Sequence, residues 1–107
     1  MELMNVGIYV RSSISEQTAH QLDALRAFAT ARGWQAIEYI DEGLSGATEH
    51  RPALDALLAA ARARRIDVII CAGLDRIARS PRYLAALAAE LKRLGVEIMV
   101  LDRATAL

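Results

Sequence analysis

Serine, aspartate and arginine side chains stand at the ends of apolar runs in this chain. They are Arg11, Ser12, Ser13, Asp75, Arg76 and Arg79. A serine hydroxyl that attacks phosphorus must lose its proton, and the added negative charge of the pentavalent state must be stabilised. Arginine guanidinium groups stabilise such charge when they are held in place beforehand. The residue types therefore favour phosphoryl transfer.

The two segments that carry these side chains, residues 11–13 and 74–80, each also have a purely structural explanation. Ser13 and Glu16 fit the S-x-x-E capping box, which satisfies free amides at the start of a helix. Capping leaves Arg11 unexplained, because a cation beside the positive end of a helix dipole is mildly unfavourable. In "LDRIARS", residues 74–80, Asp75 could pair with a neighbouring arginine in a solvated loop. On spacing alone, both structural alternatives stay open.

Other chemistries fit the spacing less well. Four residues separate Cys71 from Arg76, one fewer than a cysteine-phosphatase loop requires, so we expect Cys71 in the core. No glycine-rich phosphate-binding motif follows the first apolar run. His20 and His50 have no partner pattern that would complete a hydrolase triad, and we expect both at the surface. No carboxylate pair or His/Cys cluster has metal-ligand spacing, so we expect neither a metal nor another cofactor.

Alternating hydrophobic patterns predict alternating strands and helices. The expected strands are residues 3–10, 34–41, 66–74 and 96–102. Three helices are expected between them: the first ends near Gly33, the second begins at Pro52, and the third runs from Ser80 to Gly95. This alternation is typical of an α/β fold with right-handed crossovers and helices on both faces of a parallel sheet. We predict three layers, α/β/α, with strand order 2-1-3-4. Residues 42–50 should form a mobile surface loop.

The carboxyl ends of parallel strands lie along one edge of a sheet, where ligands bind. This rule should bring together three groups of side chains: Arg11, Ser12 and Ser13 from the first strand, Asp41 from the end of the second, and the "LDRIARS" segment after the third. Arg76 and Arg79 are at helical spacing and could face the same way. Gln17 and Gln21 are also at helical spacing, which is more typical of an exposed helix face than of a binding site.

Composition indicates one globular domain of 107 residues with 54% hydrophobic residues. The formal net charge is zero, which argues against binding nucleic acid by bulk electrostatics alone. A single cysteine cannot form an internal disulfide, so a reducing compartment is expected. No apolar run reaches the length of a membrane span. We expect a soluble, cytoplasmic protein without a membrane partner.

Three sequence blocks resemble the catalytic domain of the serine recombinases, which are the resolvases, the invertases and related integrases. The first is Y-x-R-x-S with a glutamine four places on, formed by Tyr9, Arg11, Ser13 and Gln17. The second is "DEGLSG" followed by "RPAL", and the third is "LDRIARS". All three occur in order and at family spacing, and the resemblance covers nearly the whole chain.

The resemblance implies that Ser13 attacks a DNA phosphodiester, leaving a 5′-phosphoserine link and a free 3′-hydroxyl, and that rejoining is the reverse reaction. It also implies that Arg11, Arg76 and Arg79 surround the scissile phosphate, that Arg51 and Asp41 support them, and that Asp75 orients its arginines. Gln17 matches a glutamine of the family site directly, and Gln21 matches a second one if one residue is dropped from the intervening turn. Ser12 replaces a residue that is usually apolar. Because strand residues alternate sides, Ser12 should point away from the face of Arg11.

The resemblance also implies double-stranded DNA as the partner and a homodimer or tetramer in the full-length context. Family members continue into a long dimerisation helix and a separate DNA-binding domain. Residues 1–107 stop before both, so we expect this chain alone to be monomeric or weakly associated. The alternative is a non-catalytic relative that acts as a binding or regulatory module.

Overall fold

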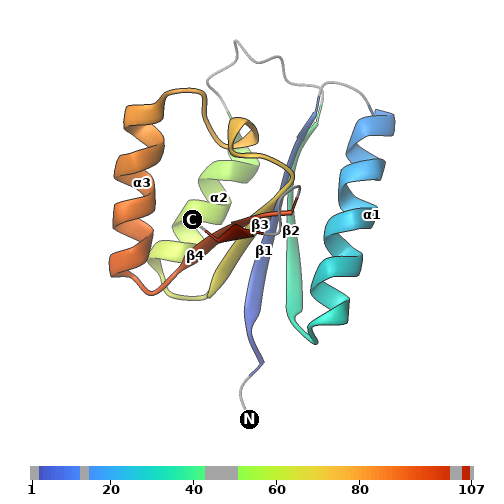
Figure 1. The fold of residues 1–107 in the computed structure, drawn as a ribbon, viewed down its shortest axis with the longest axis horizontal. Helices are drawn as coiled ribbons and strands as arrows, with labels where there is room; N and C mark the ends of the chain where they lie inside the picture. The colour runs from blue at the N-terminus through green and yellow to red at the C-terminus, as the bar shows by residue number, and fades with distance from the viewer. Residues whose placement is uncertain (1–2, 13–14, 43–50, 102–104, 107) are drawn as a thin grey trace.

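The computed structural model describes residues 3–12, 15–42, 51–101 and 105–106. Its elements, in chain order, are β1 (Asn5–Ser12), α1 (Ser15–Ala31), β2 (Gln35–Glu42), α2 (Pro52–Arg62), β3 (Val68–Cys71), the short 3-10 helix η1 (Leu74–Arg76), α3 (Pro81–Arg93), β4 (Glu97–Val100) and β5 (Thr105–Ala106). Figure 1 shows the strands of the sheet between the helices.

The sheet has the order β2-β1-β3-β4-β5. The first four strands pair in parallel, so the predicted α/β class and the order 2-1-3-4 are confirmed. No sequence pattern predicted β5, which adds antiparallel to the edge of β4 with Val100 opposite Thr105. Two residues are too few for a strand pattern to be visible.

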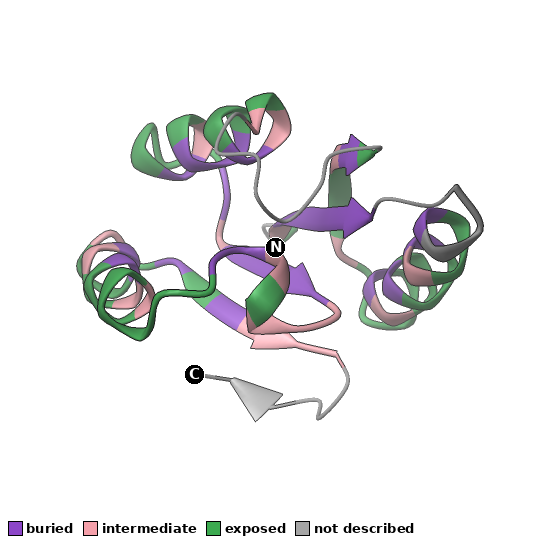
Figure 2. Cartoon of the chain, turned by 90° about the horizontal axis from the view of Figure 1, so that it is seen from above, coloured by how far each residue is buried: buried purple, intermediate pink, exposed green. Residues whose placement is uncertain are grey.

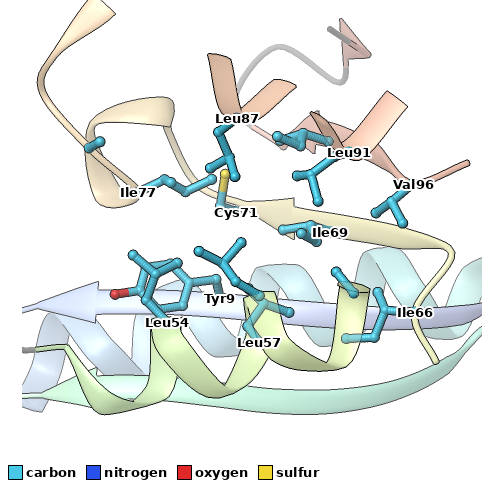
Figure 3. Close-up of a cluster of buried hydrophobic side chains, with 14 residues drawn as sticks. Tyr9, Leu54, Leu57, Ile66, Ile69, Cys71, Ile77, Leu87, Leu91 and Val96 are labelled. Carbon is cyan, nitrogen blue, oxygen red and sulfur yellow. The ribbon is translucent and has the colours of Figure 1, made fainter. Parts of the chain in front are cut away.

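Helices cover both faces of the sheet, with α1 on one face and α2 and α3 on the other (Figures 1 and 2). Alternate residues of β1 serve the two cores, as strand geometry requires. Val6, Ile8 and Val10 pack under α1. Tyr9 packs with Leu54 and the other side chains under α2 and α3 (Figure 3).

Gly7 lets α2 approach the sheet closely. A Cβ placed at Gly7 would lie 2.4 Å from Cδ1 of Leu57 and 3.0 Å from Cδ1 of Ile66. A larger side chain at Gly7 would therefore require the ends of the Leu57 and Ile66 side chains to move. This close packing brings the first turn of α2 toward the carboxyl ends of β1 and β2.

The strand boundaries differ from the predicted ones where the chain leaves the sheet. β1 runs to Ser12 rather than residue 10, and Arg11 and Ser12 are buried. β3 ends at Cys71 rather than residue 74, because the chain turns at Gly73 into η1. β4 covers only Glu97–Val100. Glu42, the first residue of the predicted loop, belongs to β2, and residues 43–50 lie outside the described residues.

Within the described ranges, no helix is long and apolar enough to cross a membrane. His20 is exposed on α1, as expected, whereas His50 lies outside the described residues. Cys71 is fully buried, which confirms its place in the core.

Candidate active site

Arg11 is a buried cation at the carboxyl end of β1, with only 7% of its surface exposed. Burial of a charged group is costly unless its donors are bonded. Its Nε donates to the main-chain oxygen of Arg76 over 3.2 Å, and its Nη2 donates to that of Asp75 over 2.9 Å. The backbone of η1 therefore fixes the guanidinium of Arg11.

Arg51 reaches the same stretch of backbone from the start of α2. Its Nη1 donates to the oxygen of Arg76 over 3.1 Å and to that of Ile77 over 2.6 Å. The carbonyl of Arg76 thus accepts from Arg11 and from Arg51, as its two lone pairs allow. Neutral acceptors orient both cations without cancelling their charge.

Positive charge accumulates at this edge of the sheet. The pKa of Arg11 lies below its ordinary value, first because of burial and then because of the nearby charges of Arg51, Arg76 and Arg79. Within the described residues, Nε of Arg76 is buried and has no hydrogen-bond partner. Several guanidinium donors at one place suit the oxygens of a phosphate group.

The carboxylate of Asp75 contributes little to this cluster. It is 66% exposed, and its Oδ2 lies 3.8 Å from Nη1 of Arg76, at the limit of an ion pair. The residue acts on Arg11 through its main-chain oxygen instead. The family resemblance implied that the Asp75 side chain orients arginines of the site, and among the described ion pairs this long contact with Arg76 is what supports that role.

Arg76 and Arg79 are at helical spacing but do not belong to one helix. η1 ends at Arg76, and Arg79 is an exposed residue before α3. Both side chains are nonetheless close enough to Arg11 to lower its pKa. The chain between them is not helical, yet both side chains lie near Arg11, in line with the prediction that they could face the same way.

Asp41 stands at the end of β2, in register with Arg11, but its side chain turns to a helix cap. It is 3% exposed and accepts from the amides of Ala53 and Leu54 over 2.9 and 3.1 Å. Its third bond, over 2.8 Å, comes from the hydroxyl of Tyr9. Asp41 therefore fixes the start of α2, from which Arg51 extends.

Tyr9 is a site residue for which no role was predicted, although it belongs to the first sequence block. Burial, followed by its bond to Asp41 and the charge of that carboxylate, raises the pKa of its phenol; Arg51 has a smaller, opposite effect. The hydroxyl stays a donor across the physiological pH range. A tyrosine two residues before Arg11 shares its face of β1, and this spacing was the available signal.

Gln21 lies in the site rather than on an exposed helix face. Its Nε2 is 3.5 Å from the main-chain oxygen of Arg11, and within the described chain its buried Oε1 has no partner. Gln17 belongs to α1 but its side chain is outside the described residues, as is the whole of Ser13. The choice between capping and chemistry for Ser13 therefore stays a prediction.

Across the described parts of the chain, no three His, Cys, Asp or Glu side chains gather as metal ligands do. Burial raises the pKa of the Cys71 thiol to about 12. A thiol so far from ionisation is a poor nucleophile at neutral pH. The groups at this edge are thus suited to binding and polarising an anion.

A family model and two solved structures point to the same protein family. The family model described as "Resolvase, N terminal domain" matches residues 6–106. The N-terminal catalytic domain of TP901-1 integrase has 30% sequence identity and a TM-score of 0.83, with 95% of this chain and 81% of that chain covered. The C-terminal catalytic domain of ISC1926 TnpA, an IS607-like serine recombinase, has 29% identity and a TM-score of 0.75, with 92% and 70% covered.

A shorter relative comes from Bacillus phage phi105, where it is described as "Uncharacterized immunity region protein 3". It is 43% identical over 61 residues, which cover 50% of this chain and 74% of the relative. The family match extends over almost all of the sheet and its helices, and it confirms the resemblance to serine recombinases. The chain belongs to the resolvase N-terminal domain family.

Proposed function

We propose that this chain is the catalytic domain of a site-specific DNA recombinase that cleaves and rejoins DNA through a covalent bond to Ser13. The observation that carries the proposal is the cluster of arginines held by main-chain carbonyls, with Arg11 and Arg51 sharing the oxygen of Arg76. This cluster keeps its positive charge and is available to a phosphodiester.

In the proposed reaction, the hydroxyl oxygen of Ser13 forms a bond to phosphorus while the bond from phosphorus to the 3′-oxygen breaks. The serine proton leaves during attack, and the 3′-oxygen gains a proton as it departs. Arg11, Arg76 and Arg79 stabilise the non-bridging oxygens in the pentavalent state. The reverse reaction, with an exchanged 3′-hydroxyl, restores the serine and joins the new strand.

The other site residues have supporting roles in this proposal. Asp41 holds the start of α2, and Arg51 adds charge and rigidity beside the phosphate. Gln21, whose Oε1 has no partner among the described residues, and Gln17 are proposed neighbours of the reacting groups. The carboxylate of Asp75 is proposed to assist Arg76. Double-stranded DNA, a dimer or tetramer of the full-length protein, and a cytoplasmic location complete the proposal.

The test compares two serines in the full reading frame, using DNA that carries the target site. Ser13→Ala should abolish covalent protein–DNA adducts, as detected on denaturing gels, whereas Ser12→Ala should retain most of them. EDTA should leave adduct formation unchanged. Adducts that persist in Ser13→Ala place the nucleophile elsewhere, and loss in EDTA with recovery in magnesium identifies a different class of phosphoryl transfer.

A second candidate function is a non-catalytic binding or regulatory module. The observation that favours it is the phage relative, whose name refers to an immunity region and not to a recombinase. Under this alternative, the full reading frame binds DNA without forming adducts, and Ser13→Ala leaves its binding unchanged. The same pair of gels therefore separates the two functions.

A further inference from the structure

Hydrogen bonds form a closed circuit through the carboxyl end of β1, the start of α2 and η1. The hydroxyl of Tyr9 donates to Asp41, which accepts from the first amides of α2. From the residue that precedes α2, Arg51 donates to the oxygen of Arg76. Arg11 donates to that same oxygen and closes the circuit, two residues beyond Tyr9 on β1.

The cap of α2 comes from outside the helix, which is why Tyr9 matters. Arg51 occupies the N-cap position, with φ −135° and ψ 83°, and its side chain makes no cap hydrogen bond. Asp41 replaces that cap from the end of β2, a distance of 12 and 13 residues along the chain from the amides it binds. A carboxylate at a helix N-terminus is favourable, but one that is 3% exposed needs every acceptor site met.

We infer that Tyr9 is a positioning residue whose hydroxyl holds Asp41 against the first turn of α2 and so keeps Arg51 bound to the carbonyls of Arg76 and Ile77. Only the expected effect of Tyr9 on catalysis rests on the proposed function; its effect on the position of Arg51 does not. The influence of Arg51 on the phenol of Tyr9 shows that these two groups are close.

A purely structural role for the Tyr9 ring makes a different prediction. The ring packs in the core with Leu54 (Figure 3), and Tyr9→Phe keeps that packing while it removes only the hydroxyl. If the ring alone matters, the substitution leaves Arg51 untouched. If the hydroxyl positions α2, the bonds of Arg51 change even though the core stays filled.

The first experiment observes Arg51 directly, by NMR of the arginine side chains in the 107-residue chain. Arg51→Lys assigns its resonances. We expect Tyr9→Phe to shift or broaden the Arg51 guanidinium signals, and Tyr39→Phe to leave them unchanged. Tyr39 is the matched control because it pairs with Tyr9 in register, on the same face of the neighbouring strand. An unchanged Arg51 signal in folded Tyr9→Phe overturns the inference.

Asp41→Asn supplies a second variant if Tyr9→Phe fails to fold. It keeps the shape of the side chain but removes the charge that caps α2, and it should move the same Arg51 signals. If neither substitution moves them, Arg51 is held without the circuit and the inference is wrong. Melting temperatures of all variants show whether a change in the signals follows from general loss of stability.

The second experiment measures adduct formation in the full reading frame. Tyr9→Phe should slow it about tenfold, and the slowing should vanish when Arg51→Lys is already present, because contacting residues that act together are not additive. Equal slowing in both backgrounds overturns the inference. Absence of adducts in the unaltered protein contradicts the proposed function instead, and the NMR result then decides the inference by itself.

Discussion

Arginines hold this molecule together in two regions by different kinds of partner. On the flanks, Arg26 of α1 forms a two-pronged ion pair with Glu38 of β2, and Arg62 of α2 does the same with Glu90 of α3. At the carboxyl edge of the sheet, Arg11 and Arg51, the residue before α2, are held by main-chain oxygens. One region pairs charge with charge, and the other binds charge to neutral dipoles.

The electrostatic consequence is opposite in the two regions. Hydrogen bonds to the glutamates raise the pKa of Arg26 and Arg62 and lower that of Glu38 and Glu90. Burial and other cations lower the pKa of Arg11. Carbonyl partners therefore fix the direction of a guanidinium while its charge remains available, which is the condition that a phosphate site requires.

The largest expected effect comes from Arg11→Lys in the full reading frame. Lysine cannot bond two carbonyls as a planar fork does, and the loss of one preorganised donor typically costs about 10²–10³ in rate. We expect adduct formation to fall about 100-fold or more. Arg62→Lys, on the flank, should change it less than about twofold. Similar losses for both variants would remove the distinction between the two regions.

A divalent anion should stabilise the carboxyl edge and not the flanks. We expect sulfate, compared with chloride at equal ionic strength, to raise the melting temperature of the 107-residue chain. At ten times its Kd the gain is about 1.4 kcal/mol. Arg76→Gln should reduce the gain and Arg26→Gln should retain it. A gain of equal size in both variants would show that sulfate acts through general exclusion from the surface.

Acid should separate the two kinds of arginine. The pKa of Glu38 and Glu90 is lower in the folded state than in the unfolded state, so their pairs stabilise the fold above pH 4.5 and are lost as pH falls through the lower, folded values. Between pH 6 and pH 3, we expect the NMR signals of Arg26 and Arg62 to move. Those of Arg11, which has carbonyl partners, should stay unchanged while the chain is folded.

The smallest effect is expected from Glu90→Gln. The side chains of this ion pair are 51% and 35% exposed, so water and salt screen it strongly. We expect a slight fall in melting temperature in dilute buffer that disappears in 1 M NaCl, as measured by circular dichroism. A large fall that persists in salt would mean that this flank pair acts like a buried one.

Hydrophobic patterns predicted the four parallel strands and the covering helices, and the rule of right-handed crossovers predicted the strand order. They are strong signals because residues of the four parallel strands pack into the two cores under the helices. The rule that the carboxyl ends of parallel strands share one edge predicted that Arg11 and Asp41 would lie together, and they are in register. Family motifs added Arg51, which no pattern of hydrophobic residues would have identified.

Sequence patterns were weakest where main-chain atoms determine the arrangement. The carbonyl of Arg76 organises two arginines, and a main-chain acceptor has no residue type that could reveal it. For the same reason, the cap of α2 was missed, since Asp41 is distant in sequence from the amides that it binds. The helical spacing of Arg76 and Arg79 did not reveal the backbone between them, because a three-residue 3-10 helix ends at Arg76.

Cys71 gives the molecule a built-in reporter of local opening. It is the only cysteine, it is fully buried, and it stands in register with Tyr9 beneath the arginine cluster. With its thiol shielded, a labelling reagent reacts only in molecules whose core has transiently opened at this edge. The labelling rate, measured against a small thiol at the same pH, therefore gives the free energy of that opening. Any ligand that tightens the arginine cluster should slow the labelling in proportion to its occupancy.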